Sequence, residues 1–222
     1  MNSQIYKKFS PSLAYVVGLI TTDGSLAKDK RHINFTTKDY QLAHLFKKIL
    51  SLPNKIGKKS NSIDTKKKYY FIQFGDVNFY KWLEKIGLTY NKTHKLKDLK
   101  VPRIYFRDFL RGHLDGDGSI VNYKDNYQSY KNKRYHYNRL YLTFHSSSPK
   151  HILWIQNEIN SYLNIQGSLS GWKVKDRKIK LWKLRFAKNN SLEILPWIYY
   201  KLDLPCLLRK RKIAQRCIKL LS

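Results

Sequence analysis

Cysteine is scarce in this sequence, with two residues in 222, Cys206 and Cys217. They form neither a CxxC pair nor a set of paired spacings. A disulfide framework is therefore excluded, and no zinc site is expected. Both cysteines are predicted to be small core or surface residues.

Long apolar runs are also missing. The longest, Leu13 to Ile20, is far shorter than the roughly 20 residues of a membrane-spanning helix. Residues 1–10 lack the apolar core of a signal peptide. We therefore expect a soluble intracellular protein with no membrane partner. Abundant Lys, Asn, Tyr and Ile are typical of an A·T-rich genome, which favours an organelle (mitochondrion or chloroplast) or a bacterial or archaeal cytoplasm.

Acidic residues are few. Fifteen Asp and Glu stand against 44 Lys and Arg, and the net charge of +29 is spread over the whole chain. Nucleic acid is the favoured partner, because neutralised phosphates release counterions. An anionic membrane is less favoured, since the charge is not concentrated on one amphipathic helix. A hydrophobic content of 42% is enough for a packed core, so a disordered polyelectrolyte is excluded.

The chain repeats itself. The segment from Gly18 through Asp23 to Ser25 recurs, with the same spacing, from Gly112 through Asp117 to Ser119. Apolar and polar patterns downstream of each segment follow the same order. The second half is longer because of an insertion within 122–138, rich in Lys, Arg and Tyr, which predicts a long hairpin. We expect one repeat at 1–98 and a second at 99–222, including the longer first hairpin and a C-terminal helix.

Hydrophobic periodicity predicts helix, hairpin, helix, hairpin and helix in each half. Where the alternation slips between 178 and 186, we expect a bulge near Trp182 and Lys183. The predicted helices lie at about 11–22, 39–50 and 77–87 and at about 103–116, 149–162, 189–202 and 209–221, and the second hairpins at about 54–75 and 165–186.

The first strands alternate between apolar and polar residues. Ile33 and Phe35 are predicted to face the core, which leaves His32, Asn34 and Thr36 on the opposite face. The second half repeats this pattern in 139–145. An exposed polar face of this kind suits readout of a DNA groove. The predicted DNA contacts are Ser25, Lys28, Arg31, His32, Asn34, Thr36, Lys58, Lys68, Gln73, Ser119, Tyr123, Arg139, Tyr141, Thr143, Ser168, Ser170, Trp172, Lys173, Lys180, Lys183 and Arg185.

Small residues spaced four apart predict close packing of the two apolar helices. They are Gly18 and Thr22 in the first helix, and Gly112 and Gly116 in the second. Such packing brings the helix ends, and with them Asp23 and Asp117, together. Because adjacent carboxylates repel each other unless a cation lies between them, we expect a divalent metal site.

The two segments VVGLITTDG (16–24) and LRGHLDGDG (110–118) resemble the paired motifs of single-chain LAGLIDADG homing endonucleases. The resemblance covers nearly the whole chain. It implies an α/β (α+β) fold of two pseudo-symmetric αββαββα repeats. Each repeat would carry a four-stranded antiparallel, saddle-shaped sheet on the DNA major groove, and the two motif helices would pack at the interface through Gly18 and Gly112. It also implies a monomer with pseudo-two-fold symmetry.

The resemblance further implies an enzyme of intron homing. Such an enzyme hydrolyses both strands of a long asymmetric double-stranded DNA target with Mg²⁺ and leaves 3′ overhangs, while Mn²⁺ or Ca²⁺ can substitute in binding. Asp23 and Asp117 carry over as catalytic metal ligands, with the Thr22 and Gly116 carbonyls as additional ligands. Lys38 and Lys188 are interpreted as basic residues that polarise the scissile phosphates or assist water.

Both motifs depart from the family pattern. The first motif has Thr21 where the family has its first Asp, whereas the second motif has Asp115 there; the position is expected to serve helix packing or capping. The second motif departs at two other positions. Arg111 and His113 are polar and are expected to face solvent or DNA.

Two alternatives on the same scaffold stay open. One is an intron-encoded RNA maturase, because basic sheets can also accept structured RNA. The other is a noncatalytic DNA-binding regulator. The presence of an aspartate in both motifs favours the nuclease.

Overall fold

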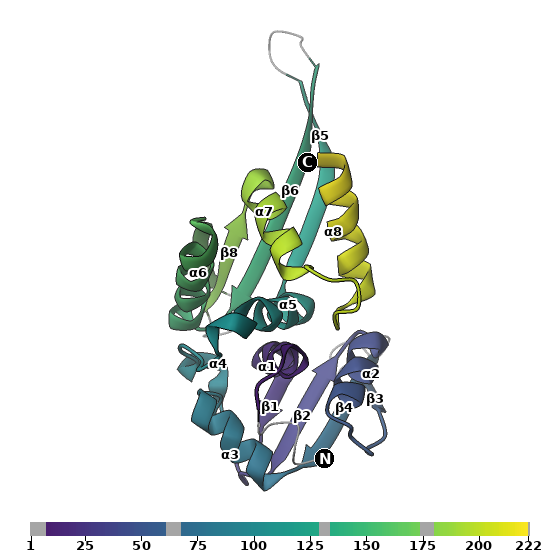
Figure 1. Ribbon diagram of the computed structural model, residues 1–222, viewed down its shortest axis with the longest axis vertical. Helices are drawn as coiled ribbons and strands as arrows, with labels where there is room; N and C mark the ends of the chain where they lie inside the picture. Colours follow the sequence, from purple (N-terminus) through teal and green to yellow (C-terminus); the bar gives the residue numbers. More distant parts are fainter. Residues whose placement is uncertain (1–7, 61–67, 129–133, 174–179, 222) are drawn as a thin grey trace.

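The computed structural model describes residues 8–60, 68–128, 134–173 and 180–221. Two repeats are built on the same plan and meet at their motif helices, α1 and α5 (Figure 1). The first repeat contains α1 (Pro11–Asp23), β1 (Gly24–Leu26), β2 (His32–Thr37), α2 (Tyr40–Ile49), β3 (Gly57–Ser60), β4 (Lys68–Gly75), α3 (Val77–Ile86) and the single turn α4 (Lys92–Lys95). The second contains the 3₁₀ turn η1 (Arg103–Tyr105), α5 (Phe106–Asp117), β5 (Ser119–Gln128), β6 (Arg134–Ser146), α6 (Pro149–Leu163), β7 (Ser168–Lys173), β8 (Lys180–Phe186), α7 (Lys188–Ile198) and α8 (Leu208–Leu221).

Local sequence signals set the helix boundaries. The Ser10 hydroxyl accepts a hydrogen bond from the Leu13 amide, and Pro11 occupies the first turn of α1. Asp76 caps α3 in the same way, through the Phe79 amide, and α3 ends at a left-handed Gly87. Among the described helices, none has both the length and the apolar character needed to cross a membrane.

Each repeat folds its four strands into one antiparallel sheet. The strand order is β1-β2-β4-β3 in the first sheet and β5-β6-β8-β7 in the second, so the two topologies are identical. Apolar side chains from one face of each sheet, including Phe35, Ile72, Phe144 and Phe186, are buried against the helices. The predicted α+β fold and its duplication are therefore confirmed.

The two motif helices pack at backbone contact distance. A Cβ atom added at Gly18 would lie 2.2 Å from the Phe109 carbonyl oxygen, and one added at Gly112 would lie 2.1 Å from that of Tyr15. Both obstacles are backbone atoms, which cannot move aside as a flexible side chain can. Glycine is therefore required at both positions, as the four-residue spacing predicted.

Three details differ from the sequence prediction. Residues 103–105 form a 3₁₀ turn, and α5 begins only at Phe106. Helix α7 ends at Ile198, whose carbonyl accepts a hydrogen bond from the buried Arg111 guanidinium. The bulge expected near Trp182 is wrong, because the β6–β8 and β7–β8 pairs run without interruption through 180–186. Trp182 packs against the core in phase with Leu184, so the strand needs no extra residue; residues 174–179 lie outside the described part.

The segment entering α8 fastens the second repeat to the first. Arg209 forms a two-pronged ion pair with Asp39, with nitrogen–oxygen distances of 3.1 and 3.0 Å. The Gln41 side chain donates to the Cys206 carbonyl and accepts from the Leu208 amide, both at 3.2 Å. Asp39 and Gln41 belong to the start of α2. These contacts attach residues 206–209, at the start of α8, to the first repeat, and we call them the clasp between α8 and α2. Helix α8 then runs along β5 (Figure 1).

Candidate active site and nucleic-acid interface

Two carboxylates lie at the ends of the motif helices. Asp23 is the last residue of α1 and is partly buried, whereas Asp117 is the last residue of α5 and is exposed. Burial and, to a smaller extent, the negative charge of Asp117 together raise the pKa of Asp23 to about 7. The helix ends themselves lie side by side, because a Cβ atom added at Gly116 would be 1.9 Å from the Thr22 hydroxyl oxygen. The charge of Asp117 therefore acts on Asp23 across this contact.

Two buried lysines bind the C-terminal ends of the motif helices. Lys92 of α4 donates to the carbonyls of Ile20, Thr21 and Thr22. Lys210 of α8 donates to the carbonyls of Leu114, Asp115 and Gly118, the last two at 2.9 and 2.8 Å. The exposed fractions of Lys92 and Lys210 are 8% and 4%. Each ammonium group therefore satisfies orphan carbonyls and lies at the negative end of a helix dipole.

The same lysines act on the carboxylates. The charges of Lys92 and Lys210 lower the pKa of Asp23 and so oppose the effect of burial. Burial lowers the pKa of Lys92 to about 8, although Asp117 and Asp23 pull it upward. Sequence analysis missed this pair, because the spacing from motif aspartate to lysine differs between the two halves.

The residues at the helix ends fit a divalent cation in part. Two neighbouring carboxylates supply the hard oxygen ligands that Mg²⁺ prefers, and a cation would relieve the repulsion that raises the Asp23 pKa. The Thr22 carbonyl already accepts a hydrogen bond from Lys92 at 3.4 Å. Within the described ranges, no cluster of three or more His, Cys, Asp or Glu residues could hold a metal. Further ligands would have to come from backbone carbonyls such as that of Gly116, from water or from DNA phosphate.

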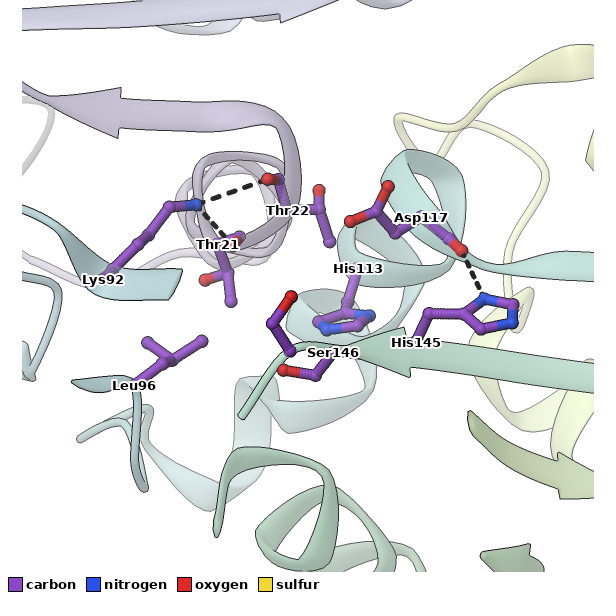
Figure 2. A pocket seen from close by; sticks show the side chains of 9 residues that line it. Thr21, Thr22, Lys92, Leu96, His113, Asp117, His145 and Ser146 are labelled. Carbon is purple, nitrogen blue, oxygen red and sulfur yellow. Dashed lines mark hydrogen bonds between the residues drawn. The ribbon is translucent and has the colours of Figure 1, made fainter. Parts of the chain in front are cut away.

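A small pocket of about 80 Å³ opens beside Asp117 (Figure 2). The end of α1, Lys92 and the end of β6 enclose it. At its edge, His145 Nδ1 donates a hydrogen bond of 2.9 Å to the Asp117 carbonyl. The lining residues are Thr21, Thr22, Lys92, Leu96, His113, Asp117, His145, Ser146 and Ser147.

The two lysines predicted as auxiliary catalytic residues lie elsewhere. Lys38 follows β2, and its Nζ is 5.7 Å from the centre of the Tyr69 ring. Lys188 is the first residue of α7. Neither residue lines the pocket beside Asp117. Their catalytic role stays a prediction, while Lys92 and Lys210 are the cations that act on Asp23.

The polar residues within the second motif are buried, so the expectation that they face solvent or DNA is wrong. Arg111 is fully buried and donates to Asp108 and to the carbonyls of Ile198 and Pro205. His113 is 1% exposed, and burial lowers its pKa well below the ordinary value. Arg111 finds carbonyl partners at the end of α7 and in the segment before α8, whereas His113 packs among the rings of Phe109, Phe144 and His151.

Asp115 has the packing role that was expected. Its carboxylate accepts hydrogen bonds from the Tyr15 hydroxyl at 2.9 Å and from the Leu207 amide at 2.7 Å. Burial raises its pKa to about 6. The residue joins α1 of the first repeat to the segment that leads into α8.

The outer face of the first sheet is polar. Directly paired strand residues share a face, and Asn34 pairs with both Ser25 and Gln73. Lys58 pairs with Tyr70 and Lys68 with Ser60, which places both lysines on the opposite, helix-facing side. Of the predicted contacts, the outer face carries Ser25, His32, Asn34, Thr36 and Gln73, while Lys28 and Arg31 are exposed in the β1–β2 turn.

The second sheet follows the same rule. Lys173 pairs with Lys180, and this pair is in phase with the buried Leu184 and Phe186, so both lysines lie toward the helices. Thr143 is on the outer face but only 7% exposed. The predicted contacts on this face are Ser119, Tyr123, Arg139, Tyr141, Thr143, Ser168, Ser170, Trp172, Lys183 and Arg185.

The insertion of the second repeat extends the β5–β6 hairpin into a long two-stranded ribbon (Figure 1). Its pairing continues without a break from Ser119 with Thr143 to Gln128 with Arg134. Arg139 on this ribbon forms a 3.0 Å ion pair with Asp125. Residues 129–133, which connect β5 to β6 in the sequence, lie outside the described part.

The first repeat matches a known family. Residues 10–87 match the family model of the LAGLIDADG-like domain. No curated protein matches the chain by sequence.

Solved structures share the fold of nearly the whole chain. The I-LtrWI LAGLIDADG homing endonuclease bound to target DNA aligns with a TM-score of 0.60 at 13% identity, over 95% of this chain and 90% of that one. The I-SmaMI LAGLIDADG homing endonuclease bound to cleaved DNA gives 0.59 at 14% identity, over 96% and 88%. Full-length DUF199/WhiA from Thermatoga maritima gives 0.56 at 14% identity, over 98% of this chain but 64% of that one. The resemblance is confirmed: the chain has the two-repeat fold of single-chain LAGLIDADG homing endonucleases.

Proposed function

We propose that this protein is a site-specific endonuclease that binds double-stranded DNA as a monomer and cuts both strands. The observation that carries the proposal is the meeting of Asp23 and Asp117 at the ends of two packed helices, between two sheets with exposed polar faces. A structural role would not require two repelling carboxylates, one of them partly buried, at equivalent positions of both repeats.

The sheets supply DNA binding. Their outer faces carry hydroxyl, amide, imidazole and guanidinium groups that can contact base edges and phosphates. A net charge of +29 favours binding through counterion release. The outer faces of the two sheets carry different residues at most equivalent positions. The DNA sequence that they recognise is therefore asymmetric. The ribbon of the second repeat extends the surface on its side.

The aspartates would hold Mg²⁺, with Mn²⁺ or Ca²⁺ able to substitute in binding. When bound, the ion supplies charge neutralisation at the scissile phosphate and a more acidic water. Asp23 and Asp117 orient this centre, while Lys92 and Lys210 hold the helix ends in place and add positive charge beside the phosphates. Both strands would be cut across the minor groove, leaving 3′ overhangs, as expected of an enzyme of intron homing.

The test is cleavage of a target selected from a randomised DNA library. Asp23→Asn and Asp117→Asn should each abolish cutting of both strands in Mg²⁺, because amides bind hard cations poorly. DNA affinity should change little, since the sheets provide it. Asp203→Asn, at an exposed position outside both motif helices, is the matched control and should cut normally.

Two results would contradict the proposal. The first is full cutting by either motif variant, or by the parent protein in excess chelator. The second is tight, selective DNA binding by the parent without any cutting, which would indicate a noncatalytic regulator. Tighter binding of structured RNA than of any duplex DNA would favour the maturase alternative.

A further inference from the structure

A groove of about 700 Å³ lies on the helix-facing side of the first sheet, near the edge strand β3, where α2 packs on β4 (Figure 1). Tyr40, His44 and Lys47 line it from one stripe of α2, since residues three and four positions apart share a helix face. The rest of the lining, from the segment before β3 and from β3 and β4, is Lys55, Ile56, Lys58 and Tyr70. The volume is within the roughly 300–1,000 Å³ of small-ligand sites, and the lining contains cations but no acid. The groove therefore has room for an anionic ligand.

Two tyrosines give the groove an aromatic wall. Tyr40, the first residue of α2, is 54% exposed. The half-buried Tyr70 contacts it edge-on, with 5.2 Å between ring centroids and an interplanar angle of 66°. His44 follows one turn along α2, with its ring centroid 6.3 Å from that of Tyr40. These contacts orient the Tyr40 ring and leave much of it open, which is what stacking of a nucleobase requires.

Three lysines supply the positive charge. Lys47 Nζ donates to the carbonyls of Pro53 and Asn54, at 3.4 and 2.8 Å, and so ties the segment before β3 to α2. Lys55 and Lys58 are exposed, and within the described ranges neither has a carboxylate partner. Their ammonium groups are therefore available to phosphate oxygens.

The second repeat lacks this chemistry at the corresponding places. Counted from the N-cap residues of α2 and α6, the corresponding pairs are Tyr40 and Pro149, His44 and Leu153, and Lys47 and Gln156. At the equivalent register of the sheets, Lys58 pairs with Tyr70, whereas Gly171 pairs with Trp182. The Trp182 ring is covered by Lys180, whose Nζ is 4.2 Å from the ring centre. Because both repeats have the same fold, packing of the fold does not require the aromatic and basic lining of the first.

The groove is separate from the face proposed to bind duplex DNA. Lys58 lies on the helix-facing side with Tyr70, whereas the neighbouring Lys59 lies on the outer face, where it donates to the Thr36 hydroxyl at 3.3 Å. The backbone of the sheet lies between the two sides. A duplex bound on the outer face therefore leaves the groove free for another ligand.

We propose that this groove binds single-stranded nucleic acid, with one base against Tyr40 and the flanking phosphates on Lys55 and Lys58. Stacking tolerates any sequence, because every base has an aromatic face. The recognised groups are the base face and the phosphates, which DNA and RNA share, so strands with either sugar should bind with similar affinity. The inference does not rest on the cleavage centre.

The experiment measures binding of a short fluorescent single strand to the full chain, in chelator and in excess unlabelled duplex DNA of mixed sequence. The duplex occupies the outer faces, and the strand should stay bound. Tyr40→Ala should weaken strand binding roughly fivefold or more, because stacking is lost, whereas Tyr40→Phe keeps the ring and should bind within about twofold of the parent.

Two charge changes test the phosphate contacts. Lys58→Glu should weaken strand binding and make its salt dependence shallower by about 0.7 log unit per lost phosphate contact. Lys180→Glu is the matched control, since it makes the same charge change on the helix-facing side of the second sheet. It should leave strand binding within about twofold of the parent.

An abasic strand of the same length should bind roughly fivefold or more weakly than the strand with bases. Equal binding of the abasic strand, or of a polyglutamate peptide, would overturn the inference, because it would mean that charge alone is recognised. Displacement of the strand by excess duplex would overturn it by placing the strand on the outer faces. A preference of more than tenfold for DNA or for RNA would overturn it as well. A parent protein that does not cut DNA would refute the proposed function and leave this inference standing, since the groove shares no residue with the ends of the motif helices.

Discussion

Replacement of Asp23 by asparagine should stabilise the protein in the absence of metal and DNA, with a pH dependence set by the buried carboxyl. The pKa of Asp23 is raised from its ordinary value of 3.8 to about 7, chiefly by burial and then by Asp117. Between these values the folded protein binds more protons than the unfolded chain, so stability falls as pH rises. At 1.36 kcal/mol per pH unit, the destabilisation approaches about 4 kcal/mol above pH 7.

Asparagine removes this titration. Asp23→Asn should therefore match the parent below about pH 4, become progressively more stable than the parent between pH 4 and pH 7, and keep that advantage at pH 8. For a chain of this size, the full gain corresponds to a rise in melting temperature of roughly 8–16 °C. Thermal unfolding of both proteins in chelator, measured at several pH values, provides the assay. Asp117→Asn is the matched control and should gain less, because Asp117 is exposed.

Added Mg²⁺ gives a second check. If a bound cation relieves the repulsion between Asp23 and Asp117, Mg²⁺ should stabilise the parent more than it stabilises Asp23→Asn. The difference in melting temperature between the two proteins at pH 8 should then become smaller. An Asp23→Asn protein whose melting temperature tracks that of the parent at every pH from 5 to 8 would refute the reasoning, since it would mean that the carboxyl is neither buried nor repelled.

Three other changes test packing and binding. Gly18→Ala should destabilise the protein by at least about 1–3 kcal/mol, since its Cβ would meet a backbone oxygen at 2.2 Å, whereas the Cβ of Gly75→Ala would meet only side-chain atoms of Arg31 and His32, at 3.0 Å or more; equal melting temperatures would contradict this. Deletion of 122–138 should weaken DNA binding and make its salt dependence shallower by about 0.9 log unit per lost phosphate contact; an unchanged slope would mean that the ribbon does not touch DNA. Arg185→Ala on the outer face should weaken DNA binding more than Lys180→Ala on the helix-facing side, as measured by titration at fixed salt; equal losses would contradict the assigned faces.

The fold could be predicted from the sequence because its signals are local and duplicated. The small residues at Gly18 and Gly112 fixed the contact between the motif helices, and that contact alone brings Asp23 and Asp117 together. Alternation of polar and apolar residues in β2 and β6 assigned the faces of the central strands. Both signals are local: the small residues are four positions apart in each helix, and the strand alternation has a period of two.

The parts that were missed depend on distant contacts. Lys92 and Lys210 reach the helix ends from elements far along the chain, and no spacing rule connects them to the motifs. Arg111 looked exposed because it is charged, yet its partners, such as the Ile198 carbonyl, come from a helix whose end the sequence placed too late. Lys58 was assigned to the outer face by charge, and only its pairing with Tyr70 shows the opposite.

The clasp between α8 and α2 limits how this protein could have arisen and how it could be rebuilt. Duplication of one half would yield two interchangeable modules, but Arg209 and the backbone of Cys206 and Leu208 now depend on Asp39 and Gln41 of the other half. The same segment carries Lys210, which binds the end of the second motif helix. A hybrid that exchanges the first repeat for a foreign one would therefore lose an anchor of the second repeat's own centre unless the start of α2 is transplanted with matching residues. Each half has become part of the other's scaffold.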